Sequence, residues 1–199
     1  MNVYVVLSRS TTVLSRAIRL VTGAEVTHAA LALDPGLERM FSFGRRRAGN
    51  PFVGCFKRER IDDELYRAMA TLPGVVLRVP VTPQQHEAIR VQVAQFAIDR
   101  DRYSYNLSGL VGRGSEGSPR FVCSEFVYHV LRGAGVCDLA VPRWKVRPQT
   151  LLRVPGEVVF RGDLKTYGPA SAAAPCAVGA VASAHRTLTG DRTRVRIGV

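Results

Sequence analysis

Two side chains combine a reactive group with the surroundings that nucleophilic catalysis requires. Cys123 follows a loop rich in Gly, Ser and Pro, and it stands where the segment FVCSEFVYHVLRGAG begins a helix. Unpaired N–H groups and the helix dipole favour an anion there, and the thiolate is the reactive form of cysteine. The same N–H groups, with the Ser124 hydroxyl, could stabilise the oxyanion of an acyl intermediate. A buried structural cysteine is the alternative reading.

His28 is the candidate base for this thiol. A thiol nucleophile needs a base within hydrogen-bond reach, and histidine titrates near neutral pH. His28 begins the segment HAALAL, where a strand is expected, although a half-buried histidine without a catalytic role would fit the same pattern. The other histidines are weaker candidates: His86 lies on a polar helix face, His129 lies six residues into the cysteine helix, and His185 lies near the C-terminus.

Hydrophobic periodicity and turn signals indicate the elements that must position these residues. Asp34-Pro35-Gly36 predicts a turn between two strands, and Thr82 followed by Pro83 predicts a helix start. The segments 44–60 and 100–120 lack periodicity and are expected to be loops. We expect strands over residues 2–7, 27–34, 38–44 and 74–81, and helices over 13–23, 83–100 and 121–133, the second with Ile89, Val93, Phe96 and Ala97 facing the core.

The length of 199 residues and the composition predict one domain and a tail. Residues 1–167 are enough to bury a self-sufficient core, whereas 168–199 are dominated by Ala, Gly, Pro and Ser and are expected to be an unstructured tail. None of the cysteines forms a C-x-x-C pair, and no two histidines have a helical metal-binding spacing. We therefore expect no disulfide scaffold, no metal site and no cofactor.

The net charge of +12 has two readings. It could attract an anionic partner such as nucleic acid, phospholipid headgroups or a wall polymer, or it could reflect the arginine-rich usage of the genome. No zinc motif, helix-turn-helix signature or basic strand interleaved with aromatics is present, so specific nucleic-acid binding is not expected. No apolar stretch reaches the roughly 20 residues of a transmembrane helix. The N-terminus is a poor signal peptide, which predicts a cytoplasmic location and leaves export by another route open. A monomer is also expected.

Four separated segments form a distinctive order along the chain: SRSTTVLSRAIRLVTG, THAALAL, MFSFGRRRAGNPFVGCF and FVCSEFV, with His before Cys. In this order they resemble the circularly permuted NlpC/P60 papain-like superfamily. The superfamily includes the YiiX/YaeF-like amidases and the lecithin–retinol acyltransferase-like proteins, and the third segment is similar to bacterial proteins described as distant relatives of cell-wall-associated hydrolases. The resemblance covers about residues 3–155. It implies an α+β fold in which an antiparallel sheet packs on the helix that carries the nucleophile.

The resemblance also implies a third residue that orients His28. Relatives carry it on the strand after the histidine strand, and the position in this chain that corresponds is Ser42. A serine orients an imidazole less strongly than a carboxylate does, so a Cys123–His28 dyad or a slow enzyme would also fit. Glu38 lies on the hairpin side of that strand and is a poorer substitute. Asn106 could act only if its loop folds inward.

Further residues could line the pocket or its rim. Tyr103 and Tyr105 precede the nucleophile helix, where relatives carry pocket or oxyanion groups, although loop anchoring would explain them equally well. Glu125 suits the first turn of a helix and needs no catalytic role. Arg45, Arg46 and Arg47 could hold an anionic substrate at the rim, or they could simply be a solvated basic loop.

These residues predict a thiol hydrolase or acyltransferase that works through an acyl-enzyme on Cys123. The expected substrate is a peptide-, glycopeptide- or lipid-like molecule, cleaved at an amide, isopeptide or ester bond. A catalytically lapsed binding module on the same fold is the alternative, since Ser42 is a weak orienting residue. A basic nucleic-acid-binding protein is the third possibility, suggested by the charge alone.

Overall fold

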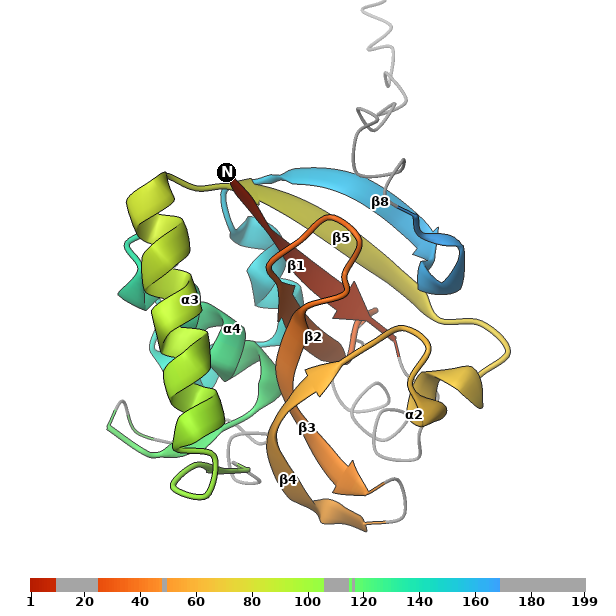
Figure 1. Ribbon diagram of the computed structural model, residues 1–199, viewed down its shortest axis with the longest axis horizontal. Helices are drawn as coiled ribbons and strands as arrows, with labels where there is room; N and C mark the ends of the chain where they lie inside the picture. Colours follow the sequence, from red (N-terminus) through yellow and green to blue (C-terminus); the bar gives the residue numbers. More distant parts are fainter. Residues whose placement is uncertain (10–24, 48–49, 106–114, 116, 169–199) are drawn as a thin grey trace, which may run out of the picture.

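The structure is a computed structural model that describes residues 1–9, 25–47, 50–105, 115 and 117–168. Its centre is a six-stranded antiparallel sheet with the strand order β4-β3-β2-β1-β5-β8 (Figure 1). The predicted helix over 13–23 and the predicted tail beyond Gly168 lie outside the described residues. The α+β class that the sequence predicts is therefore confirmed, with helices packed on an antiparallel sheet.

The middle of the sheet is built from the most apolar segments of the chain. β1 (Asn2–Ser8) pairs antiparallel with both β2 (His28–Ala32) and β5 (Pro73–Pro80). Its β-branched residues suit a strand that is buried on both faces, because they pack well on a pleated surface. In this register Ser8 lies opposite His28, so the candidate base stands at the end of the central strand pair.

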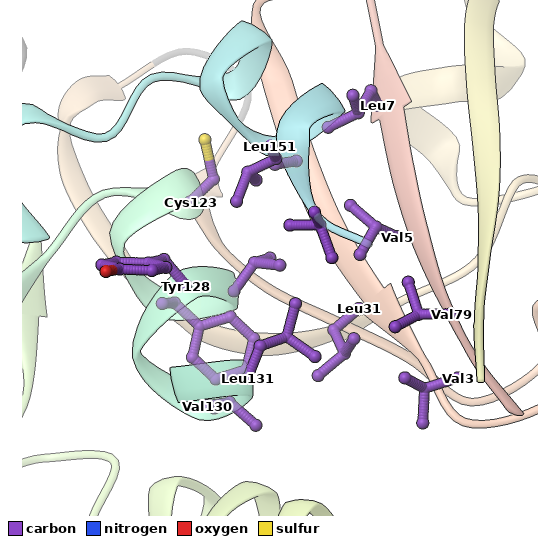
Figure 2. Close-up of a cluster of buried hydrophobic side chains, with 14 of the residues drawn as sticks. Val3, Val5, Leu7, Leu31, Val79, Cys123, Tyr128, Val130, Leu131 and Leu151 are labelled. Atoms are coloured by element: carbon purple, nitrogen blue, oxygen red, sulfur yellow. The ribbon is translucent and has the colours of Figure 1, made fainter. Parts of the chain in front are cut away.

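Alternate residues of the strands bury two separate cores. On one face, α3 (Pro83–Ile98) and α4 (Cys123–Gly133) cover the sheet, and Figure 2 shows Val3, Val5, Leu31 and Val79 directed toward α4. On the other face, a short helix α2 (Glu64–Arg67) and the following turn cover Tyr4, Val6, Ala30 and Met40, among others. The period-two alternation of a strand places these sets on opposite faces.

The helix α3 follows the sequence prediction closely. Thr82 caps it: its hydroxyl accepts from the Gln85 N–H, and the Gln85 side chain accepts from the Thr82 N–H. Ile89, Val93 and Phe96 are buried as expected, but Ala97 is exposed, so its predicted place in the core is wrong. Ala97 follows Phe96 by 100° around the helix, which turns it away from the sheet.

The prediction of a loop over 44–60 is wrong. β3 (Met40–Arg47) and β4 (Asn50–Glu59) form a long antiparallel hairpin, with an irregular register between Arg45 and Arg47. β3 also pairs with β2 through Leu31 and Phe41, as the predicted hairpin requires. The glycines and arginines of β4 make this strand hard to predict from local propensity. Pairing with β3 supplies the backbone hydrogen bonds of β4.

The remaining described elements complete the sheet and link it to α4. β8 (Glu157–Asp163) pairs with β5 at one edge, and β6 (Ser104–Tyr105) pairs in parallel with β7 (Arg120–Phe121) just before α4. Short 3-10 segments occupy Arg143–Lys145, Pro148–Arg153 and Leu164–Thr166. Each helix in the described part of the chain is too short or too polar to span a membrane.

Candidate active site

Cys123 is the first residue of α4 and lies at the edge of the larger core. Its side chain is 7% exposed, and Figure 2 shows the sulfur directed away from Leu131 and Val130, beyond Leu151. Val122 precedes it with extended backbone and is the N-cap residue. The N–H groups of this first turn have no acceptor within the helix, which gives an anion at Cys123 nearby donors.

The carboxylate of Glu125 fixes the start of this helix. Its Oε2 accepts a hydrogen bond of 3.1 Å from the Val122 N–H, and it lies 4.0 Å from the Arg143 guanidinium. Both side chains are fully buried, and Arg143 also stacks over Phe121 at 4.2 Å. Arg143 donates to the carbonyls of Ser115, Ser118 and Arg120. Glu125 therefore has the structural role expected of it. The contacts of Glu125 and Arg143 stabilise the chain just before Cys123.

The side chain that orients His28 is Glu59. The His28 Nε2 and the Glu59 Oε2 lie 2.9 Å apart, and their side chains are 17% and 1% exposed. The prediction of Ser42 as the hydrogen-bonding partner of His28 is therefore corrected. Glu59 is the last residue of β4, the strand mistaken for a loop, so the sequence did not indicate its place beside His28.

Two other residues hold the Glu59 carboxylate. The Tyr66 hydroxyl donates to the Glu59 Oε2 at 3.0 Å, and the Lys57 Nζ lies 3.1 Å from the Glu59 Oε1. Ser42 is fully buried beside this group, and its hydroxyl lowers the pKa of Glu59, although no hydrogen bond of regular geometry joins the two side chains. Ser42 thus lies next to the orienting carboxylate and not next to the imidazole.

Gly44 makes room for this arrangement in the strand between His28 and Glu59. A Cβ at residue 44 would lie 2.8 Å from the Lys57 Cε and 2.9 Å from the Glu59 Oε1. Both distances are too short for atoms that are not bonded. A side chain at residue 44 would therefore displace the ends of these two side chains, which lie over β3 as Glu59 reaches toward β2.

The charges of this buried pair stabilise each other. Burial by itself lowers the pKa of His28, but attraction to Glu59 and Cys123 outweighs burial and raises the pKa to about 10. For Glu59, burial alone would raise the pKa, and the neighbouring His28 and Lys57 reverse that effect, so the pKa lies well below its usual range. At neutral pH the site therefore holds an imidazolium beside a carboxylate.

Cys123 interacts with the same imidazole. Its charge and its side chain both contribute to the raised pKa of His28. Since Glu59 occupies Nε2, the ring nitrogen that remains for the thiol is Nδ1. The three side chains come from β4, β2 and α4 and form the chain Glu59–His28–Cys123. Such a sequence of acid, imidazole and nucleophile can activate a thiol for attack on a carbonyl carbon.

The Ser124 hydroxyl has a hydrogen-bond partner away from the triad. It is buried and donates to the Val146 carbonyl at 2.7 Å, so the predicted role in an oxyanion site does not fit its direction. The backbone N–H groups at the start of α4 remain the candidate donors.

Tyr103 and Glu38, the other candidates whose side chains are described, have partners outside the triad. Tyr103 packs on Phe96, with ring centroids 4.5 Å apart, and also on Phe121, as expected of an anchoring aromatic. The backbone of Tyr105 lies in β6, but its side chain and all of Asn106 lie outside the described residues. Glu38 is exposed and pairs with Arg60 at 3.5 Å.

The basic residues predicted at the rim lie on the hairpin. Arg45, Arg46 and Arg47 belong to the end of β3, and their side chains are outside the described part of the structure. Their predicted contact with an anionic substrate therefore stays a prediction. The chain beyond them returns as β4 to Glu59, so the hairpin itself is part of the candidate site.

One signal in the sequence could have revealed Glu59. It is the single acidic residue of the segment 44–60, and it closely follows the continuous run of apolar or small residues 52–56, which is consistent with a buried strand. Among the described residues, no cluster of three His, Cys, Asp or Glu side chains is arranged to hold a metal ion.

Comparison with models of known protein families, with curated proteins and with solved structures found no match to this chain.

Proposed function

We propose that this chain is a thiol hydrolase or acyltransferase of the permuted NlpC/P60 papain-like kind, with Cys123 as nucleophile, His28 as acid–base and Glu59 as the orienting residue. The observation that supports this most directly is the hydrogen bond of 2.9 Å between a buried carboxylate and the imidazole that interacts with Cys123. A structural histidine needs neither a buried carboxylate nor a thiol at a helix start beside it, whereas a histidine that activates a nucleophilic thiol uses both neighbours.

The proposed reaction proceeds through an acyl-enzyme. The Cys123 thiolate attacks the carbonyl carbon of the substrate, and the carbonyl electrons move to oxygen. N–H groups of the first turn of α4 stabilise this oxyanion. The tetrahedral intermediate then collapses, and the imidazolium of His28 gives its proton to the leaving amine or alcohol. Water or an acceptor hydroxyl or amine loses a proton to His28, attacks the thioester, and releases the free acid or the transferred acyl product.

Amide, isopeptide and ester bonds all fit this chemistry. The substrate classes that follow from the resemblance are peptides, peptidoglycan stems and lipid esters. The alternative of a catalytically lapsed module was motivated by Ser42 as a weak orienting residue. With Glu59 in contact with His28, that motivation no longer applies, and the hydrolase or transferase is the better-supported function.

Alkylation of the thiols tests the proposal without knowledge of the substrate. The full chain is treated with iodoacetamide from pH 5 to pH 9, and each modified cysteine is identified by mass spectrometry. We expect Cys123 to react below pH 7, and the rate to fall at least about tenfold in His28→Ala, because the imidazolium that favours the thiolate is lost. Cys137 is the internal control, since burial and the nearby Asp138 raise its pKa.

The opposite outcome is equally informative. Slow alkylation of Cys123 only at high pH, with the same rate in wild type and His28→Ala, would mean that the fold lacks an activated thiol. The proposal would then be withdrawn, and binding assays would replace a substrate screen.

A further inference from the structure

Glu59 has more partners than an orienting carboxylate needs. One hydrogen bond from the His28 Nε2 is enough to fix the ring, yet Tyr66 donates to the same oxygen and Lys57 lies 3.1 Å from the other. The three partners come from β2, α2 and β4. The carboxylate is 1% exposed, so these donors take the place of water and share its charge.

The contact with Lys57 is built into the hairpin. The Lys57 side chain is 25% exposed, so its ammonium group could reach solvent instead of Glu59. The absence of a side chain at Gly44 leaves the space that the Lys57 Cε and the Glu59 Oε1 occupy. A lysine that merely covered the surface would not need a glycine in the neighbouring strand.

Sharing the charge of Glu59 has a consequence for proton transfer. A carboxylate paired with one imidazole favours the imidazolium strongly, and such an imidazolium is a weak acid toward a leaving group. A positive charge and a hydroxyl donor on the same carboxylate reduce its attraction for the imidazole proton. The positive charge of Lys57 also disfavours a second positive charge nearby.

We propose that Lys57 and Tyr66 are positioning residues that act on His28 through Glu59: by sharing the negative charge of the carboxylate, they weaken its hold on the imidazole proton and leave His28 able to release it. This inference rests on the proposed function for its catalytic meaning. The contacts on which the inference is based all involve described residues. In the described structure, Glu59 from β4 and Cys123 from α4 act on His28 directly, while Lys57 from β4 and Tyr66 from α2, with Asp63 beside it, act on Glu59.

The test is an NMR titration of the His28 ring nitrogens in the full chain that carries Cys123→Ala. This background removes the thiol, so the result does not depend on whether Cys123 is reactive. We expect Lys57→Gln, which keeps a hydrogen-bond donor but loses the charge, to raise the apparent pKa of His28 by about 0.5–1. Tyr66→Phe should raise it by a smaller amount, about 0.3, because a neutral donor is lost.

Two matched variants control for general effects. Lys57→Arg keeps the charge and should leave the pKa of His28 within about 0.2 of its starting value. Lys145→Gln removes the same charge from an exposed position and should also leave it unchanged. If Lys57→Gln does not fold, the Tyr66→Phe titration decides, since a phenyl ring keeps the packing of the buried tyrosine.

The outcomes separate clearly. An unchanged or lowered pKa of His28 in both Lys57→Gln and Tyr66→Phe would overturn the inference, even if the variants were less stable, because a purely structural role affects unfolding and not this titration. A raised pKa together with an unreactive Cys123 in the alkylation experiment would support the inference and reject the proposed function.

Discussion

The His28 Nε2 and the Glu59 Oε2 lie 2.9 Å apart although 31 residues separate them in the chain. The residues belong to β2 and β4, and β3 lies between these strands, so the Glu59 side chain has to reach across it. Gly44 in β3 leaves space for that reach. The contact therefore depends on three neighbouring strands at once, and the predictions below test its parts separately.

The first prediction compares the two residues that could orient His28. Glu59→Gln keeps the shape of the side chain but removes the charge that favours the imidazolium. Substitution of the orienting acid in a catalytic triad lowers the rate by up to about 10⁴-fold, and we expect the rate of Cys123 alkylation at pH 6 to fall at least about tenfold. Ser42→Ala should change it by less than about threefold, since its hydroxyl has no regular hydrogen bond. A larger effect at Ser42 than at Glu59 would restore the serine as the orienting residue.

The second prediction concerns the space at Gly44. In Gly44→Ala, the new Cβ would collide with the Lys57 Cε and the Glu59 Oε1, so these side chains must move. We expect the free energy of unfolding to fall by about 1–3 kcal/mol, together with slower alkylation of Cys123. Gly117→Ala is the matched control, because its Cβ would meet no atom within 4 Å. Equal stability and reactivity of the two variants in denaturant and alkylation assays would contradict the crowding at Gly44.

The third prediction is a pH dependence of stability. The pKa of His28 is raised from its ordinary 6.5 to about 10, so its contribution to stability is complete below pH 6.5 and is lost as the pH rises toward 10. The pKa of Glu59 is lowered from 4.5, so its contribution is complete above pH 4.5 and is lost in acid. The difference in unfolding free energy between wild type and Glu59→Gln should therefore be largest from pH 4.5 to 6.5. Urea unfolding at several pH values measures it, and a difference that stays constant from pH 6 to 10 would argue against the ion pair.

The fourth prediction distinguishes a structural from a catalytic Ser124. Its hydroxyl donates to the Val146 carbonyl at 2.7 Å in the core. Ser124→Ala leaves that buried carbonyl without its donor, and we expect a loss of about 1–3 kcal/mol in the free energy of unfolding. The alkylation rate of Cys123 should be unchanged, and so should the turnover of any substrate that is found. Normal stability with a large loss of turnover would return Ser124 to the oxyanion site.

Much of the framework was predictable because its signals are local. The runs of β-branched and apolar residues in 2–7 and 74–81 predict strands, and the structure has them as β1 and β5. Thr82 and Pro83 predict the start of α3, where the capping box is present. The start of α4 at Cys123 follows from a Gly- and Ser-rich segment before an apolar stripe. In each case residues within a few positions of one another carry the physical cause.

The hairpin β3–β4 shows where local reasoning ends. Its second strand contains Gly54 and a basic stretch that disfavour a strand by propensity, and it is a strand because β3 pairs with it. With that segment interpreted as a loop, the sequence gives Glu59 no place beside His28, and the resemblance points to Ser42 on the strand after the histidine strand. The structure brings Glu59 to His28 because the segment is a strand.

The sequence by itself determined that Cys123 begins a helix and that His28 begins a strand, because caps and hydrophobic alternation are properties of neighbouring residues. Only the tertiary structure decided which carboxylate meets the imidazole, since that depends on the register of three strands and on the space above Gly44. It also decided that the Ser124 hydroxyl is bound to Val146 and that Lys57 and Tyr66 share the charge of Glu59. A buried charge interacts with the groups that lie nearest to it in space, and a linear sequence does not give those distances.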